Sequence, residues 1–275
     1  MAAPGLALVA FMGRDLAIRY LSNECVPADP DPVILEAEWQ AAIAKLSPAQ
    51  PNAGVPAISE IPAEKAGYIA KLQASPDWQE WFAANPAIEF KMVEVAPLLA
   101  YQFSILDGAA SSHGAQLGLA PSMDDLLATC LPLQHVPLSM DVALQASSAL
   151  IRSRNLNVVP TFSMPHPGVF VLQVGSSLPF AHVVRYNGRC YLHNGYHRAF
   201  AALQSGATVI PCVFRDVAAE AELGLNPGTF DIALLESANP PTLHHFASGQ
   251  AHDVELVIKT RTIHLSLTDW IAPEI

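Results

Sequence analysis

Charged residues and familiar catalytic motifs are both scarce in this sequence of 275 residues. Asp, Glu, Lys and Arg make up only 14% of it, and 14 Lys and Arg stand against 25 Asp and Glu, a formal net charge of -11. Because an acidic surface repels phosphate backbones, this composition argues against a nucleic-acid-binding protein. The sequence also contains no P-loop, no GxGxxG fingerprint and no GxSxG elbow, so it gives no support to the common Rossmann and hydrolase classes.

Cysteines and long apolar runs are lacking as well. The chain has 4 cysteines, Cys25, Cys130, Cys190 and Cys212, without a CxxC pair. They are too few for a secreted disulfide framework, so we expect a reducing, cytoplasmic setting, with Cys190 and Cys212 as small buried core residues. The apolar run 4–12 lacks a basic segment and a clear cleavage site, and no run reaches the about 18 apolar residues of a membrane helix. We expect a soluble protein without membrane contact, in which 4–12 forms a buried strand or helix.

The sequence is rich in apolar residues and in helix signals near its start. Its 51% hydrophobic residues are enough for a sizeable core, and its low charge content favours surface covered by a second copy of the chain or by a protein partner. Apolar residues recur at helical spacing between 35 and 46 and around Tyr68 and Leu72. Ser75-Pro76 is typical of a helix start. These signals predict a helical N-terminal region, 1–88.

Strand and helix signals alternate after residue 88. We expect 89–105 to be extended, 107–121 to be a loop, 122–130 and 141–154 to be helices, and 156–162 and 169–174 to be strands. A C-terminal extension, 217–275, is predicted to hold a short helix near 217–223 and two strands, 254–259 and 261–267. This mixture predicts an α/β or α+β fold with a mixed-sheet central domain over 89–216.

The segment 183–214 carries the most information about function. Asn187-Gly188 lies between two strand-forming runs, which predicts a two-residue type I′ hairpin. The second strand runs into His193, Asn194 and Gly195, after which a short helix and a strand at 208–214 are expected. We predict that strand, helix and strand form a parallel βαβ unit with a right-handed crossover.

The start of that helix has the features of an anion site. A helix N-terminus offers unpaired N–H groups and a partial positive charge. Gly195 permits close approach to the backbone, Arg198 can hold a phosphate or carboxylate through two parallel hydrogen bonds, and His197 is a donor that can change its charge near neutral pH. Ser176 and Ser177 form either a second phosphate-contacting turn or an ordinary loop.

The sequence of 191–211, YLHNGYHRAFAALQSGATVIP, resembles the glycine-x-His-Arg box of the ParB/sulfiredoxin superfamily. With the hairpin and the following strand, the resemblance covers roughly residues 156–216, and 92–102 is a weaker match to that superfamily's first strand. In the superfamily the box lies in a small α/β domain, where its His-Arg pair and the helix N-terminus contact the phosphates of ATP or CTP. The resemblance implies that Gly195, His197 and Arg198 take this part within a ligand-binding segment Asn194–Arg198, with ATP or CTP and Mg²⁺ as ligands.

Two positions depart from the superfamily's pattern. Sulfiredoxins have a cysteine directly before the His-Arg pair, whereas this chain has Tyr196, which disfavours sulfinic-acid reduction. Kinase-like and nuclease-like relatives often carry an acidic residue before the glycine, and Asn194 cannot act as a carboxylate base or a strong Mg²⁺ ligand. An NTPase or phosphotransferase with His197 and Arg198 as candidate catalytic residues would have to recruit a carboxylate such as Asp216 or Glu94. Binding without turnover is an equal alternative.

Three functions follow from these residues. The first is a nucleotide- or phosphate-ligand-binding protein, and the second is a non-enzymatic interaction or assembly protein that has kept the fold but lost the chemistry. The third is a metal-dependent enzyme, because Cys190, His193 and His197 have ligand types that suit zinc, with the pair His244-His245 as further candidates. Strand alternation argues against the zinc site by placing Cys190 and His193 on opposite faces, and a solvated loop is the alternative for the histidine pair.

Overall fold

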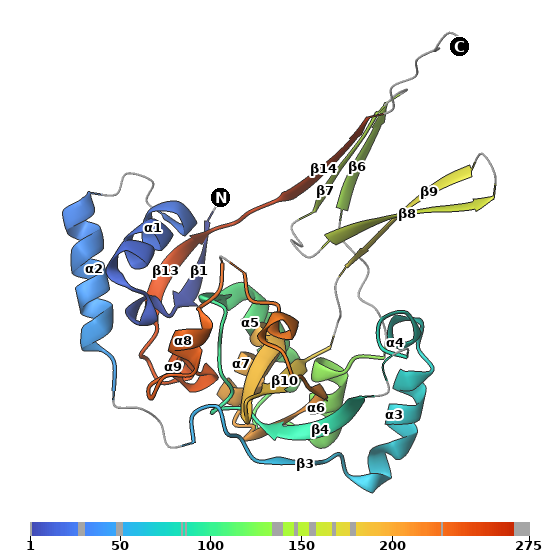
Figure 1. The fold of residues 1–275 in the computed structure, drawn as a ribbon, viewed down its shortest axis with the longest axis horizontal. Coiled ribbons are helices and arrows are strands. Elements are labelled where there is room, and N and C mark those ends of the chain that lie inside the picture. The colour runs from blue at the N-terminus through green and yellow to red at the C-terminus, as the bar shows by residue number, and fades with distance from the viewer. Residues whose placement is uncertain are drawn as a thin grey trace. The chain divides into compact units, whose positions relative to one another are not determined.

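The computed structural model describes residues 2–26, 31–47, 52–83, 85, 87–133, 140–145, 148–153, 158–166, 169–176, 180–226 and 228–266. Its mixture of helices and strands confirms the predicted α/β fold class. The chain forms two compact units, a larger one from Met1–His135 and Pro179–Val257 and a smaller one from Val136–Leu178 and Ile258–Ile275 (Figure 1). These units differ from the three consecutive regions expected from the sequence, because strands near both ends of the chain pair with each other in the larger unit.

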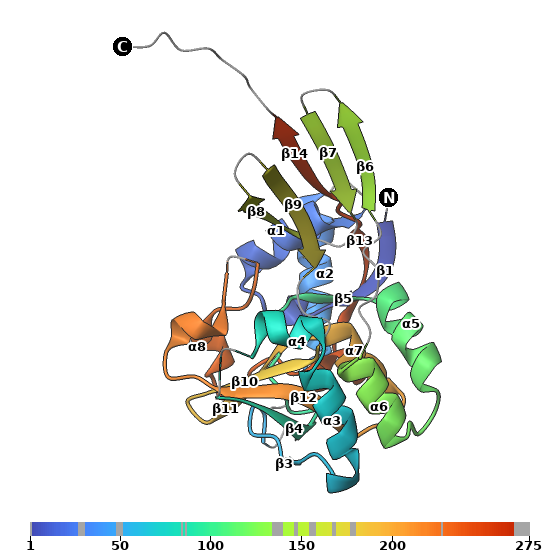
Figure 2. The ribbon, with the colours of Figure 1, turned by 90° about the vertical axis from the view of Figure 1, so that its right-hand side faces the viewer.

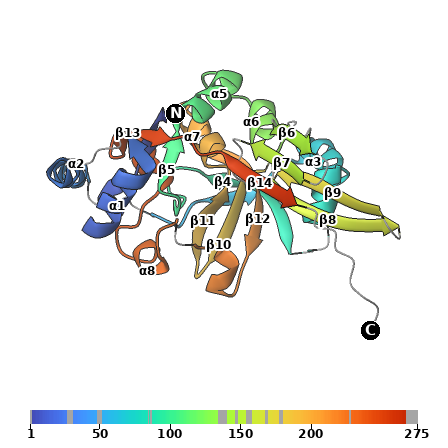
Figure 3. The same cartoon turned by 90° about the horizontal axis from the view of Figure 1, so that it is seen from above.

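The larger unit is built around a five-stranded sheet with the order β11-β10-β12-β4-β3. Its strands are β3 (Ile58–Glu60), β4 (Ile88–Glu94), β10 (His182–Tyr186), β11 (Arg189–Asn194) and β12 (Val209–Asp216). Figure 3 shows β10, β11 and β12 side by side. The hairpin of β10 and β11 confirms the prediction, since Asn187 and Gly188 have φ values of 50° and 75°, as a type I′ turn requires.

The predicted parallel βαβ unit is wrong in its pairing. The helix α7 (Tyr196–Gln204) does lead from β11 to β12, but β12 pairs in parallel with β10 and not with β11. The tight hairpin makes β11 antiparallel to β10 and places it at the end of the strand order. The strand that returns from α7 therefore lies on the other side of β10 and runs antiparallel to β11.

Two further helices, α5 (Asp107–Leu117) and α6 (Met123–Cys130), pack next to α7. The predicted helix at 122–130 is confirmed, because Ser122 and Asp125 form a reciprocal capping box at the start of α6. The predicted loop at 107–121 is wrong, since most of it is α5. Its small residues give no clear apolar stripe, and packing against α7 stabilises the helix instead. Figure 2 shows α6 beside β12.

A second sheet, with the order β2-β13-β1-β5, joins segments from the two ends of the larger unit. Its strands are β1 (Ala2–Ala7), β2 (Cys25–Val26), β5 (Ser104–Leu106) and β13 (His252–Val257), and next to them lie η1 (Val9–Phe11), α1 (Arg14–Glu24) and α2 (Pro32–Ala44). The run 4–12 thus contributes a strand and a short 3-10 helix with buried residues, as the sequence predicts. The predicted helix at 35–46 corresponds to α2.

Short helices complete the larger unit: η2 (Ala63–Lys65), α3 (Ala66–Gln73), α4 (Pro76–Trp81), η3 (Glu220–Leu223), α8 (Ile232–Leu235) and α9 (Leu243–Ala247). Ser75 caps α4 as predicted by accepting the N–H of Trp78 at 3.3 Å. The solvated loop expected around His244-His245 is wrong, because His245 is 1% exposed. Its Nδ1 accepts the N–H of Thr242 at 3.0 Å and so caps α9.

All four cysteines are free and buried, which confirms the core position expected for Cys190 and Cys212. Burial raises the pKa of the Cys130 and Cys190 thiols to about 12, so both are protonated at neutral pH. Within the described residues, no helix has the length and apolar character needed to cross a bilayer.

The smaller unit contains only strands among its described residues. β7 (Ser148–Ser153) lies between β6 (Met140–Gln145) and β14 (Arg261–Ser266), and β8 (Val158–His166) pairs with β9 (Val169–Ser176). Over their described residues, the strands expected at 156–162, 169–174 and 261–267 are confirmed as β8, β9 and β14, and the one at 254–259 as β13.

The predicted helix at 141–154 is wrong, because the described residues of this segment belong to the paired strands β6 and β7. Its Ala, Leu, Gln and Arg residues are good helix formers, which misled the prediction. The register instead follows a period of two, with Met140, Val142 and Leu144 on one face of the sheet and Asp141 and Gln145 on the other. Strand pairing here overrides local helix propensity.

Candidate functional site

Gly195 makes the turn from β11 into α7. Its φ is 91°, in the left-handed region that side chains rarely adopt. A Cβ at this position would lie 2.9 Å from Cα of Ala181, the residue just before β10. The turn therefore requires glycine both for its conformation and for its close approach to the neighbouring backbone. It places the first amides of α7 beside the end of the β10–β11 ladder, where His182 is the partner of Asn194.

The N-terminus of α7 has no side-chain cap from its own turn. Gly195 has no side chain to offer, and the first N–H groups of any helix lack partners within the helix. Asn194 uses its amide to donate to the carbonyl O of Phe180 at 3.2 Å, which ties the turn to the segment before β10. This end of α7 thus combines backbone N–H groups that have no partner within the helix with the positive end of the helix dipole, the arrangement that binds anions.

Arg198, in the first turn of α7, is a half-buried cation. No hydrogen bond or ion pair joins its guanidinium to any residue that the structure describes. Burial lowers its pKa, and the Cys130 thiol of α6 acts in the opposite direction. Burial lowers the pKa of His113 in α5, and the positive charge of Arg198 lowers it further. The guanidinium therefore lies near both helices. A buried cation that has no carboxylate partner has lost part of its hydration without compensation, and a bound anion would provide that compensation.

His197 has a different part from the one expected. Its Nε2 accepts the N–H of Leu106, at the end of β5, at 3.0 Å, so the proton of the neutral ring is on Nδ1. Burial lowers its pKa to about 4, with further contributions from His113 and Arg198. His197 is therefore neutral near pH 7, and the expectation that it changes charge there is wrong. It anchors α7 to β5 while keeping one N–H donor.

Tyr196 points into the core and is only 2% exposed. Its hydroxyl oxygen accepts the N–H of Tyr101 at 2.9 Å and that of Gln102 at 3.4 Å. Burial raises the pKa of its hydroxyl well above the usual value, so the phenol stays protonated. The side chain thus supports the site from within, and its backbone N–H is the part left to contact a ligand.

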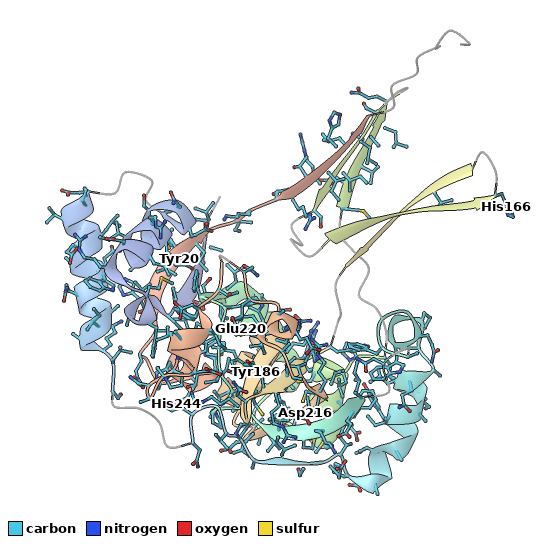
Figure 4. All side chains as sticks on the ribbon, viewed as in Figure 1. Tyr20, His166, Tyr186, Asp216, Glu220 and His244 are labelled. Atoms are coloured by element: carbon cyan, nitrogen blue, oxygen red, sulfur yellow. The ribbon has the colours of Figure 1, made fainter. Side chains whose placement is uncertain are left out.

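The other residues expected at this site lie elsewhere. Asp216 (labelled in Figure 4) forms a two-point ion pair with Arg185, with Nη2 2.7 Å from Oδ2. Glu94 accepts the N–H of Ala57 at 3.1 Å. Both carboxylates are thus engaged away from α7. Ser176 ends β9 in the smaller unit, and Ser177 lies outside the described residues.

The structure does not assemble the zinc site considered from the sequence. Cys190 is 1% exposed, and it lies on the sheet face opposite to His193 because the two are an odd number of residues apart in β11. The Nδ1 of His193 is 2.7 Å from the hydroxyl of Tyr101, while His197 is bound to Leu106. Across the part of the chain that the structure describes, no group of three or more His, Cys, Asp or Glu residues could hold a metal ion.

Sequence analysis missed a set of polar side chains around His182, at the start of β10. His182 is 4% exposed and packs against His193, with ring centroids 4.9 Å apart. The one signal in the sequence is a histidine within the otherwise apolar run 180–184. Its neighbours Tyr101 and Arg215 come from distant parts of the chain, so no local pattern could have grouped them.

Comparison with protein-family models, with curated proteins and with solved structures finds no match to this chain. The function must therefore be argued from the geometry of the residues themselves.

Proposed function

We propose that the protein binds the phosphate groups of a nucleotide or of another phosphorylated small molecule at the N-terminus of α7. The observation that carries this proposal is the half-buried guanidinium of Arg198, which has no acidic partner among the described residues. The free amides of the same helix end lie in the same turn. Both positive features belong to the first turn of α7, where a bound anion would balance them, and we call this the α7 anion site.

The resemblance of 191–211 to the ParB/sulfiredoxin box supports the same ligand class and suggests ATP or CTP, with Mg²⁺, as the first ligands to examine. Arg198 would hold phosphate oxygens through two N–H groups, and the amides of Tyr196 and His197 would contribute further hydrogen bonds. Hydrolysis or phosphoryl transfer also needs a carboxylate to orient a nucleophile or a metal ion. Since Asp216 and Glu94 are engaged elsewhere, the geometry favours binding over turnover.

The test is equilibrium binding of ATP, CTP and GTP, with and without Mg²⁺, to the intact protein and to Arg198→Ala. We expect the alanine variant to bind its preferred nucleotide roughly a hundredfold more weakly, which corresponds to about 3 kcal/mol. Arg198→Lys should recover part of this loss, because lysine keeps the charge but cannot make the two parallel hydrogen bonds.

Arg185→Ala is the matched control. It removes an arginine whose partner is an exposed carboxylate, so affinity should stay unchanged. Equal affinity of the intact protein and Arg198→Ala, or no binding of any of the three nucleotides, would refute the proposal for these ligands.

A second candidate function rests on the smaller unit. β6 is the last strand of its sheet, and its side chains Met140, Val142 and Leu144 are 37%, 53% and 77% exposed. An edge strand with apolar side chains in water favours pairing with another chain. This supports an interaction or assembly protein, either as a homo-oligomer or with a protein partner. A strictly monomeric protein in sedimentation experiments that co-purifies with nothing would argue against it.

A further inference from the structure

A second group of polar side chains lies on the sheet face opposite to Arg198. It consists of Tyr101, His182, His193 and Arg215, and we call it the His182 cluster. The strand register brings these residues close together, because Val184 is the partner of both Tyr191 and Arg215. His182 lies two residues before Val184 and His193 two residues after Tyr191, where the register of the ladder shifts. The opposite face carries Cys212, which lies near the Cys130 thiol of α6 that Arg198 approaches.

The His182 cluster has hydrogen-bonding groups that nothing in the described chain satisfies. His182 is 4% exposed, yet neither of its ring nitrogens has a partner, and the Nε–H of Arg215 has none either. Folded proteins pair nearly all buried polar groups, and an unmade bond of this kind costs stability. A neutral imidazole contributes one donor and one acceptor, so the cluster offers both kinds of group.

The hydrogen bonds of His193 determine which of its nitrogens carries the proton. Nδ1 lies 3.2 Å from the carbonyl O of Leu223, which can only accept, so Nδ1 is protonated. The Tyr101 hydroxyl donates to the carbonyl O of His193 at 3.0 Å and can accept from the same Nδ1–H. The Nε2 of His193 is consequently the bare, accepting nitrogen of the ring.

The charge of the His182 cluster is unbalanced. Burial lowers the pKa of His182 to about 3, and the remaining contributions come from His193 and Arg215, with no carboxylate among them. The nearby acidic side chains have other partners. Glu222 accepts the N–H groups of Ala218 and Ala219, and Asp216 pairs with Arg185. Arg215 makes one hydrogen bond, to the carbonyl O of Glu222, and forms no ion pair with a described residue.

We propose that the His182 cluster binds a hydrogen-phosphate group, either as free phosphate or as part of a small metabolite. Phosphate oxygens would accept from the Nε–H of Arg215 and from the N–H of His182, and the P–OH group would donate to Nε2 of His193. His193 and Arg215 are only partly buried, so the ligand enters from their side, whereas His182 is 4% exposed. The site is separate from the α7 anion site and does not depend on the proposed function.

The bare nitrogen of His193 makes a specific demand on the ligand. Sulfate has the same shape and charge as phosphate but carries no hydroxyl at neutral pH, so it would place an acceptor against an acceptor. We expect phosphate to bind at least about tenfold more tightly than sulfate, the effect of one hydrogen bond gained or lost. A simple phosphomonoester tests whether the phosphate of a metabolite binds better than the free ion.

The experiment is titration of the full chain with phosphate, with sulfate and with glycerol phosphate. Calorimetry measures the affinity, and the ¹⁵N NMR signals of the histidine rings report where the ligand binds. Phosphate should shift the ring signals of His182 and His193 in the intact protein and equally in Arg198→Ala. Arg215→Met and His182→Phe should each weaken phosphate binding at least about tenfold, whereas Arg185→Met should leave it unchanged. The NMR readout requires no variant, so poor folding of His182→Phe would leave the test intact.

Three outcomes would overturn this assignment. Unchanged His182 and His193 signals at millimolar phosphate would show that only water fills the cluster. Equal affinity for sulfate and phosphate would remove the part assigned to Nε2 of His193. Loss of the histidine shifts in Arg198→Ala would place the binding at the α7 anion site, so failure of this proposal is distinguishable from failure of the proposed function.

Discussion

Gly195→Ala should destabilise the protein by about 3 kcal/mol and lower its thermal midpoint by roughly 10 °C. Two effects add at this position. Alanine is strained at a φ of 91°, and its Cβ would lie 2.9 Å from Cα and 3.2 Å from Cβ of Ala181. The atoms that it meets belong to the backbone and first carbon of Ala181, which cannot turn aside as the end of a long side chain could. The start of α7 must therefore move, and phosphate binding at Arg198 should weaken with it.

Gly206→Ala separates these two effects. Gly206 follows the other end of α7 with a φ of 90°, but a Cβ there would meet nothing within 4 Å. In this variant the free energy of unfolding should fall only by the conformational cost, about 1 kcal/mol, and the affinity of the α7 anion site should stay unchanged. Urea unfolding of both variants measures the difference. If the two substitutions destabilise the protein equally, the close approach of Gly195 to Ala181 has no energetic importance.

The elements that the sequence predicts well are those decided by local chemistry. Asn187-Gly188 makes the hairpin because both residues tolerate positive φ, and Ser75 and Ser122 begin helices because their hydroxyls replace missing acceptors. The failures at 107–121 and 141–154 have the opposite origin. Packing against α7 stabilises α5, and pairing between strands decides β6 and β7, so neighbours distant in sequence outweigh local propensity.

The same division applies to the candidate site. The box Asn194–Arg198 predicts where the turn and the helix begin, because glycine at that point has a backbone reason that can be recognised in a sequence. What each side chain does there depends on partners from elsewhere. The backbone N–H of Leu106 donates to His197, and the backbone N–H of Tyr101 donates to the hydroxyl of Tyr196. That no described carboxylate pairs with Arg198 is also a property of the folded chain, since a sequence does not show which carboxylates lie near an arginine.

Tyr196→Phe should cost about 1–3 kcal/mol, although it removes one oxygen atom and leaves the packing intact. That oxygen accepts the N–H groups of Tyr101 and Gln102, and the phenylalanine variant would leave the buried amide of Tyr101 without its acceptor. Tyr196→Ala should cost about 5 kcal/mol, because it adds a cavity where a side chain was 2% exposed. Chemical unfolding of both variants separates the hydroxyl from the ring.

Tyr191→Phe is the matched control for the hydroxyl effect. Tyr191 is 0% exposed, and its hydroxyl has no hydrogen-bond partner among the described residues. Removing an unsatisfied buried hydroxyl should be neutral or stabilising, the opposite sign to Tyr196→Phe. Tyr101 also contacts His193, so Tyr196→Phe should disturb the histidine ring signals of the His182 cluster. The nucleotide affinity of the α7 anion site should stay unchanged. Equal stability losses in the two phenylalanine variants would mean that the Tyr196 hydroxyl does not hold Tyr101 in place.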